Sequence, residues 1–191
     1  RHALKEYFMV HQIAGSNPIL AFDNLKQQYV VFWYFKKITI INLGYEIILW
    51  TDKMILKLIN EEYPDFYKIY NSARTGVQRG DIARILLIYH HGGIYIDLDI
   101  LVLRDFAELL DMKRNTFYIS YEPVEQTKLI YNSDRYICNA FFAANKNNIF
   151  LHKLLRNIPE YINRHGYDLF GKFDIFGGSY ILTNINDYDK N

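Results

Sequence analysis

The sequence contains a single cysteine, Cys138, among its 191 residues. One cysteine cannot form a disulfide within the chain, which fits a reducing compartment, and we interpret Cys138 as a small buried apolar side chain. No apolar run reaches the roughly 20 residues that span a bilayer, and no signal peptide opens the chain. We therefore expect a cytoplasmic location, with any association with a membrane made through regions outside this chain.

The sequence also lacks an excess of charge of one sign. Its 22 basic and 21 acidic residues leave a formal net charge of +1, so the composition gives no reason to expect a nucleic-acid partner or a polybasic membrane-binding surface. It has no internal repeat, no low-complexity tract and no linker rich in proline, glycine or serine. Because half of the residues are hydrophobic and 17% are aromatic, residues 1–191 are predicted to fold as one globular domain with a large core.

Predicted strands and helices alternate along the chain. Apolar runs predict strands at 7–13, 45–50, 94–103, 116–121 and 140–144, and helical spacing predicts helices at 19–41, 54–62, 64–70, 82–89 and 149–162. Thr51 and Asp52 are typical of a helix N-cap, and Gly92 is typical of a helix end. This alternation indicates an α/β domain with a mixed, mostly parallel central sheet flanked by helices.

Two acidic residues, Asp97 and Asp99, lie inside one of the most apolar segments. Residues two apart in a strand share a face, so both carboxylates are predicted to project together on the face of Tyr95. Like charges in a desolvated setting repel each other, and a divalent cation such as Mn²⁺ or Mg²⁺ would offset that cost. The alternatives are that both carboxylates end the strand in solvent or pair with arginines. Their place at the carboxyl end of a buried strand is where α/β sheets bind ligands.

Asp81 and Arg84 are conspicuous charged residues on a helix that is otherwise apolar on nearly every side. They are three positions apart and so share one face. One interpretation is an ion pair within the helix. The functional interpretation is that this face meets the same cleft as the aspartates, where Arg84 would bond a diphosphate or a sugar and Asp81 would bond sugar hydroxyls.

The stretch from Arg79 to Leu103 resembles the signature of sugar-transferring enzymes with a DXD motif. The matching residues are Arg79-Gly80-Asp81-Ile82-Ala83-Arg84, Leu87-Ile88-Tyr89 and Gly92-Gly93-Ile94-Tyr95-Ile96-Asp97-Leu98-Asp99. Among these enzymes, the stretch most resembles the group that contains initiating α-1,6-mannosyltransferases and capsular-polysaccharide glycosyltransferases. The clostridial glucosylating toxins share the same core. Weaker similarity extends to His11-Gln12-Ile13, to residues 45–52, to residues 139–144 and to residues 176–183, which lie where the family has an acceptor-side segment.

The resemblance implies a GT-A fold, a nucleotide-sugar donor and a bound Mn²⁺ or Mg²⁺. By matching position it implies that Asp97 and Asp99 hold the metal and the diphosphate, and that Asp81 and Arg84 hold the donor sugar. It also implies that Ile13, Ala14 and Gly15 line the nucleotide pocket, that Tyr95 and Asp97 contact the ribose or the sugar, and that Asn139 lies near the donor. The chain stops before the family's carboxyl-terminal segment, so we expect the domain to be truncated there.

The predicted function is metal-dependent transfer of a hexose, with retention of configuration, from a nucleotide sugar to a hydroxyl group. UDP-hexose is the preferred donor and GDP-mannose is a second option. The acceptor is a carbohydrate, a lipid-linked sugar or a protein. Two alternatives stay open: a non-catalytic nucleotide-sugar or carbohydrate-binding module derived from a transferase, and a nucleotidyl or phosphoryl transferase.

Overall fold

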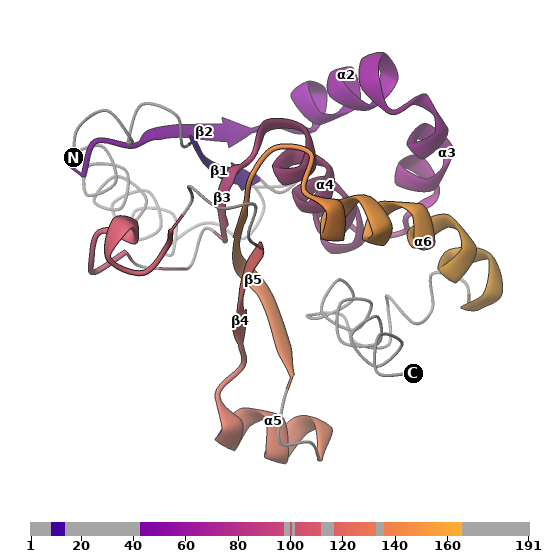
Figure 1. Cartoon of the computed structure of the whole chain (residues 1–191). Coiled ribbons are helices and arrows are strands. Elements are labelled where there is room, and N and C mark those ends of the chain that lie inside the picture. The colour runs from indigo at the N-terminus through magenta and orange to yellow at the C-terminus, as the bar shows by residue number, and fades with distance from the viewer. Residues whose placement is uncertain are drawn as a thin grey trace, which may run out of the picture.

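A five-stranded sheet forms the centre of the computed structural model, which describes residues 9–13, 43–97, 100, 102–111, 117–132 and 136–165 (Figure 1). The strands are β1 (Met9–Ile13), β2 (Glu46–Trp50), β3 (Gly93–Ile96), β4 (Phe117–Tyr121) and β5 (Ile137–Ala144). Their order across the sheet is β2-β1-β3-β5-β4. The helices are α2 (Asp52–Glu62), α3 (Pro64–Ser72), α4 (Gly76–His91), α5 (Val124–Tyr131) and α6 (Ile149–His165), with a short 3₁₀ turn at Phe106–Glu108.

The sheet is mixed, as predicted, but its described pairings are not mostly parallel. β1 pairs in parallel with β2 and β3, whereas β5 pairs antiparallel with both β3 and β4. The direction changes because β4 and β5 form an antiparallel pair joined through α5, so β5 returns against β3. Parallel strand ends therefore meet only on the β2-β1-β3 side of the described sheet.

Strand β3 is shorter than the sequence predicts. It lies between β1 and β5 and all four of its residues are buried, which explains why the segment is so apolar. The strand ends at Ile96, and the backbone N–H of Ile100 then donates to the carbonyl of Asp97 at 3.2 Å. Asp97 lies directly after the strand. The predicted strand over 94–103 is therefore wrong at the positions after Ile96 that the structure describes, which are 97, 100, 102 and 103.

The helices between β2 and β3 follow the predicted signals. The Thr51 hydroxyl accepts from the Met54 N–H at 3.4 Å, and Pro64 is the first residue of α3. α4 begins at Gly76, earlier than predicted, because Thr75 and Gln78 form a capping box: each side chain accepts from the other residue's backbone N–H at 3.2 Å. The predicted helix over 19–41 lies outside the described residues.

Helix α4 is buried on nearly every side, as its apolar composition predicted. Its buried residues pack with α6 and with the sheet in one core cluster, whose members include Ile82, Leu86, Leu151, Leu154, Tyr95 and Phe142. This position against the sheet brings the polar residues of α4 to the edge where β3 ends. No helix in the part of the chain that the structure describes is both long enough and apolar enough to cross a membrane.

The structure adds an arm that the sequence did not predict. β4 and β5 extend away from the other helices, and α5 lies at the far end (Figure 1). α5 presents little apolar surface to the core: Leu129 is 86% exposed and Ile130 is also exposed. A helix without a buried apolar face lacks the periodic pattern that predicts one, which explains the omission. β5 begins at Ile137, three positions before its predicted start, and α6 continues past its predicted end to His165.

Gly80 within α4 and Gly92 directly after it provide a test of this packing. Gly92 has φ +73°, and an added Cβ would lie 2.6 Å from the Lys146 backbone nitrogen, so Gly92→Ala is expected to lower the free energy of unfolding by about 2 kcal/mol. In Gly80→Ala the nearest atom would be the Arg84 Nη2 at 3.8 Å, and the substitution is expected to stabilise the helix by up to about 1 kcal/mol. Urea unfolding of both variants measures the difference. Equal effects would contradict the close approach at Gly92.

Candidate functional site

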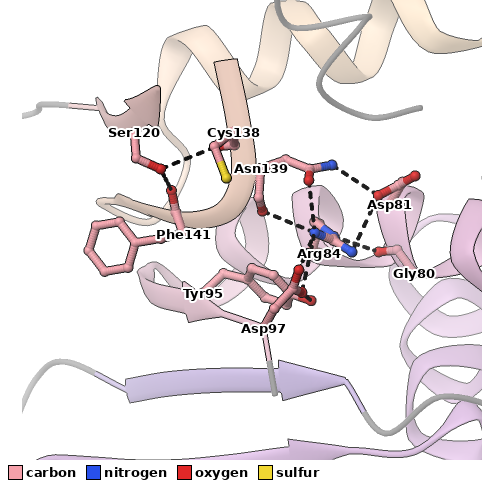
Figure 2. A network of polar contacts seen from close by, with 9 residues as sticks. All are labelled: Gly80, Asp81, Arg84, Tyr95, Asp97, Ser120, Cys138, Asn139 and Phe141. Atoms are coloured by element: carbon pink, nitrogen blue, oxygen red, sulfur yellow. Dashed lines mark hydrogen bonds and ion pairs between the residues drawn. The ribbon is translucent and has the colours of Figure 1, made fainter. Parts of the chain in front are cut away.

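Residues from three segments meet at one end of β3. Asp81 and Arg84 come from α4, Tyr95 and Asp97 from β3 and the position just after it, and Asn139 from β5 (Figure 2). The backbone N–H of Asp97 donates to the carbonyl of Ala140 on β5 at 2.8 Å, which ties Asp97 to β5. All five are residues that the sequence singled out, and the structure places them in one contiguous network.

The Arg84 guanidinium lies at the centre of this network. Its Nη1 donates to the backbone carbonyl of Asn139 at 3.0 Å and to the Asn139 Oδ1 at 3.1 Å. The same nitrogen lies 3.3 Å from the Asp97 Oδ1, while Nη2 lies 3.3 Å from the Asp81 Oδ1. The Nε donates to the carbonyl of Gly80 at 3.4 Å. Arg84 is therefore held in one orientation by two carboxylates, a side-chain amide and two backbone carbonyls.

Arg84 keeps its charge although it is only 8% exposed. Burial alone acts to lower the pKa of Arg84, but Tyr95, Asp81 and Asp97 together raise that pKa above its ordinary value. A buried cation is tolerated when opposite charges and hydrogen bonds surround it. The network thus fixes a permanent positive charge beside the carboxyl end of β3.

Asn139 joins β5 to the charged pair on α4. Its Nδ2 donates to the Asp81 Oδ1 at 2.9 Å. The pairing of β4 with β5 is interrupted here: Ile119 pairs with Phe142 and Ser120 pairs with Cys138, so residues 139–141 bulge out of register. Bulges commonly redirect a strand next to a functional site. The bulge accounts for the contact of both the carbonyl and the side chain of Asn139 with Arg84, and no feature of the sequence pattern predicted it.

Asp97 is the part of the network that is most open to solvent. Its side chain is 29% exposed, against 2% for Asp81 and 9% for Arg84. The Tyr95 hydroxyl donates to the Asp97 Oδ1 at 2.5 Å, which confirms that these two residues share a face. Burial raises the pKa of Tyr95 well above its ordinary value, so the phenol stays protonated and remains a donor. A ligand would therefore reach this network first at Asp97.

The charge on Asp97 is offset by an arginine, which was one of the alternatives that the sequence left open. Arg84 Nη1 contacts both carboxylate oxygens, at 3.3 Å and 3.4 Å. Within the described ranges, no group of three or more His, Cys, Asp or Glu side chains could hold a metal ion. In the described structure, the Asp97 carboxylate is therefore paired with the Arg84 guanidinium. Asp99 lies outside the described residues, and its predicted role stays a prediction.

The predicted nucleotide-pocket residues are only partly described. Ile13 ends β1, whereas Ala14 and Gly15 lie outside the described residues. β1 and β3 are parallel with His11 opposite Tyr95, so Ile13 and Asp97 both lie two residues beyond that pair. The carboxyl ends of these two strands therefore meet at the same edge of the sheet, where ligands bind in open α/β sheets.

Comparison with known proteins gives a consistent family match. Residues 29–116 match the family model described as a glycosyltransferase sugar-binding region containing a DXD motif. The chain is 33% identical over 123 residues to inositol phosphoceramide mannosyltransferase 1 of Schizosaccharomyces pombe, which covers 64% of this chain and 34% of that protein. It is 44% identical over 55 residues to mannosyl phosphorylinositol ceramide synthase SUR1 of Saccharomyces cerevisiae, which covers 29% of this chain and 14% of that protein. The chain spans about a third or less of the length of these two relatives.

The fold is similar to that of a solved structure. PaToxG glycosyltransferase superposes with a TM-score of 0.58 at 16% identity, covering 92% of this chain and 68% of that one. The predicted GT-A-type α/β fold is confirmed by this similarity. At this level of identity, the similarity concerns the fold alone.

Proposed function

Because residues 29–116 belong to the DXD-motif sugar-binding region of glycosyltransferases, as their signature predicted, we propose that this chain transfers a hexose from a nucleotide sugar to a hydroxyl group. The observation that carries the proposal is the network around Arg84, which holds Asp81, Asp97 and Asn139 together where β3 ends. A fixed positive charge beside a partly exposed carboxylate suits a ligand that carries both phosphates and hydroxyls.

The identity of the hexose is part of the proposal. The two fungal relatives are named an inositol phosphoceramide mannosyltransferase and a mannosyl phosphorylinositol ceramide synthase, and both names favour mannose. The donor is then GDP-mannose rather than the UDP-hexose preferred from the sequence. Both names also specify a ceramide that carries phosphorylated inositol, so the proposed acceptor is a hydroxyl group of an inositol-containing lipid.

The chain's own residues would bind and orient the donor. Asp97 would accept hydrogen bonds from donor hydroxyls at its exposed side, and the positive charge of Arg84 would favour the diphosphate over a neutral ligand. Asp81 and Asn139 hold the guanidinium in place for this purpose. In transfer, the bond between the sugar C1 and the diphosphate breaks and its electron pair leaves with the nucleoside diphosphate. The acceptor oxygen bonds to C1 with the retained configuration that the resemblance implies, and the hydroxyl proton passes to the departing diphosphate or to water.

A divalent cation belongs to the same proposal. Mn²⁺ or Mg²⁺ held at Asp99, two positions after Asp97 in the sequence, would neutralise the charge that develops on the leaving diphosphate. Asp97 is partly exposed, and its oxygens contact Arg84 and Tyr95. Residues 13–15 at the end of β1 would line the nucleotide pocket at the same edge.

A panel of nucleotide sugars tests the donor assignment. The chain is incubated with GDP-mannose, UDP-glucose or UDP-galactose in the presence of Mn²⁺, and the free nucleoside diphosphate is measured. We expect release from GDP-mannose at a rate at least about tenfold above either UDP-sugar, a ratio worth about 1.4 kcal/mol in transition-state binding. Faster release from a UDP-sugar would overturn the mannose assignment but retain the transferase. Tight donor binding without any release would favour the non-catalytic binding module, and release of a sugar 1-phosphate in place of a nucleoside diphosphate would favour a nucleotidyl transferase.

A further inference from the structure

Tyr95 is buried in the middle of the sheet and contacts a charged residue at the sheet's edge. It is 2% exposed, and its backbone pairs with His11 of β1 on one side and with Phe142 of β5 on the other. Its ring also packs against the Phe142 ring, with the centroids 5.5 Å apart. The Tyr95 backbone is therefore held by both neighbouring strands, and its ring is packed against Phe142 of β5.

The same side chain touches both charged residues that face the proposed donor. Its hydroxyl donates to the Asp97 Oδ1 at 2.5 Å, and the Arg84 Cζ lies 4.7 Å from the centroid of its ring. A hydrogen bond to an ionised acceptor is shorter and stronger than one between neutral groups. A guanidinium over a ring face is attracted by the ring's quadrupole. Tyr95 thus holds an anion by its hydroxyl and a cation by its ring.

These contacts distinguish positioning from direct binding of the donor. The resemblance implied that Tyr95 contacts ribose or sugar, but its ring is closed off and its single hydroxyl proton is committed to Asp97. Asp97 by contrast is partly exposed. Rotation of its carboxylate about the Cβ–Cγ bond has a broad energy profile, so neighbouring groups are needed to fix the orientation of the carboxylate. Tyr95 and Arg84 are such partners.

We propose that Tyr95 is a positioning residue of the glycosyl-transfer site, which acts by orienting the Asp97 carboxylate and supporting the Arg84 guanidinium. The proposal rests on the proposed function, because it concerns the same site. Tyr95 thus acts through Asp97 and Arg84 and does not itself contact the donor.

The substitution Tyr95→Phe tests the hydroxyl alone, because the ring and its packing are kept. We expect kcat/KM for the sugar donor to fall about 10- to 100-fold, the usual loss when a residue that orients a ligand-binding group is changed. The matched control is Tyr45→Phe. The Tyr45 hydroxyl likewise donates to a carboxylate, the Asp105 Oδ1 at 2.7 Å, but in a separate core cluster. We expect kcat/KM of this control to stay within about twofold of the unsubstituted chain.

A double-mutant cycle shows whether Tyr95 acts through Asp97. If it does, Tyr95→Phe lowers kcat/KM in the unsubstituted chain but adds little in an Asp97→Asn background, since the group that it orients is already altered. If Tyr95 instead contacts the donor directly, the two losses multiply. Multiplying losses would overturn the proposal.

A readout that needs no catalysis completes the test. The ¹³C signal of the Asp97 carboxyl carbon is expected to shift in Tyr95→Phe and stay in place in Tyr45→Phe, and the Asp105 signal is expected to do the reverse. An Asp97 signal that does not respond to Tyr95→Phe would overturn the proposal even in an active enzyme. Full activity of Tyr95→Phe would overturn the positioning role alone, whereas an inactive unsubstituted chain would contradict the proposed function and with it this inference.

Discussion

The variant Arg84→Met is expected to lose about 3–5 kcal/mol of unfolding free energy, the usual cost of removing one partner from a buried ion pair. Methionine approximates the length of arginine but leaves Asp81 in the core without its cation, with a side chain only 2% exposed. It also removes the donor to the backbone carbonyl and Oδ1 of Asn139. Urea unfolding followed by circular dichroism measures the loss.

The chain offers a matched control for this prediction. Arg164 pairs with Glu160 on α6, but both side chains are more than half exposed, at 66% and 62%. Exposed pairs of this kind contribute about 0–1 kcal/mol because water and salt screen them. Arg164→Met should therefore change stability by less than about 1 kcal/mol. Equal losses in the two variants would contradict a buried, charged Arg84.

The second large effect is expected on activity, from the acidic triplet. Asp97→Asn and Asp99→Asn keep the shape of each side chain but remove its charge, and each is expected to reduce transfer about 10²- to 10³-fold. Asp97→Asn removes the negative charge that pairs with Arg84 and lies at the exposed side of the network. For Asp99 the reason is the proposed loss of a metal ligand.

The control for this pair is Asp65→Asn, because Asp65 is an exposed carboxylate on α3. Its activity should stay within about twofold of the unsubstituted chain. Steady-state rates at saturating and limiting Mn²⁺ separate the two aspartates. Asp99→Asn should raise the Mn²⁺ requirement more than Asp97→Asn does, and the reverse order would place the metal on Asp97.

Much of the fold could be predicted because its local signals are strong. The Thr51 cap, Pro64 at the start of α3 and Gly92 after α4 each fix an element boundary by local chemistry, and the structure confirms them. The early start of α4 was also readable, since Thr75 and Gln78 have capping-box spacing. The length of β3 could not be predicted, because the apolar run in the sequence continues past Ile96, where the described strand ends.

The residues of the candidate site could be predicted, but their connections could not. Asp81, Arg84, Asp97 and Asn139 were all singled out, and the structure joins them. The contact between Arg84 and Asn139 joins residues 55 positions apart and depends on the bulge in β5, which has no sequence pattern of its own. The sequence alone also could not show which positive charge offsets Asp97, because a metal and an arginine are equally consistent with the sequence.

That residues 1–191 form one domain stays a prediction, because residues 1–8, 14–42 and 166–191 lie outside the described residues. The activity assay does not depend on that outcome.

The most direct test of the central claim is transfer of radiolabelled mannose from GDP-mannose to an inositol phosphoceramide acceptor, measured in the unsubstituted chain with Mn²⁺ and with a chelator. The account predicts labelled lipid with Mn²⁺, at least about 100-fold less with the chelator, and a matching loss in Asp97→Asn. A folded chain that neither transfers nor binds any nucleotide sugar, with or without Mn²⁺, would contradict the assignment of this site to glycosyl transfer.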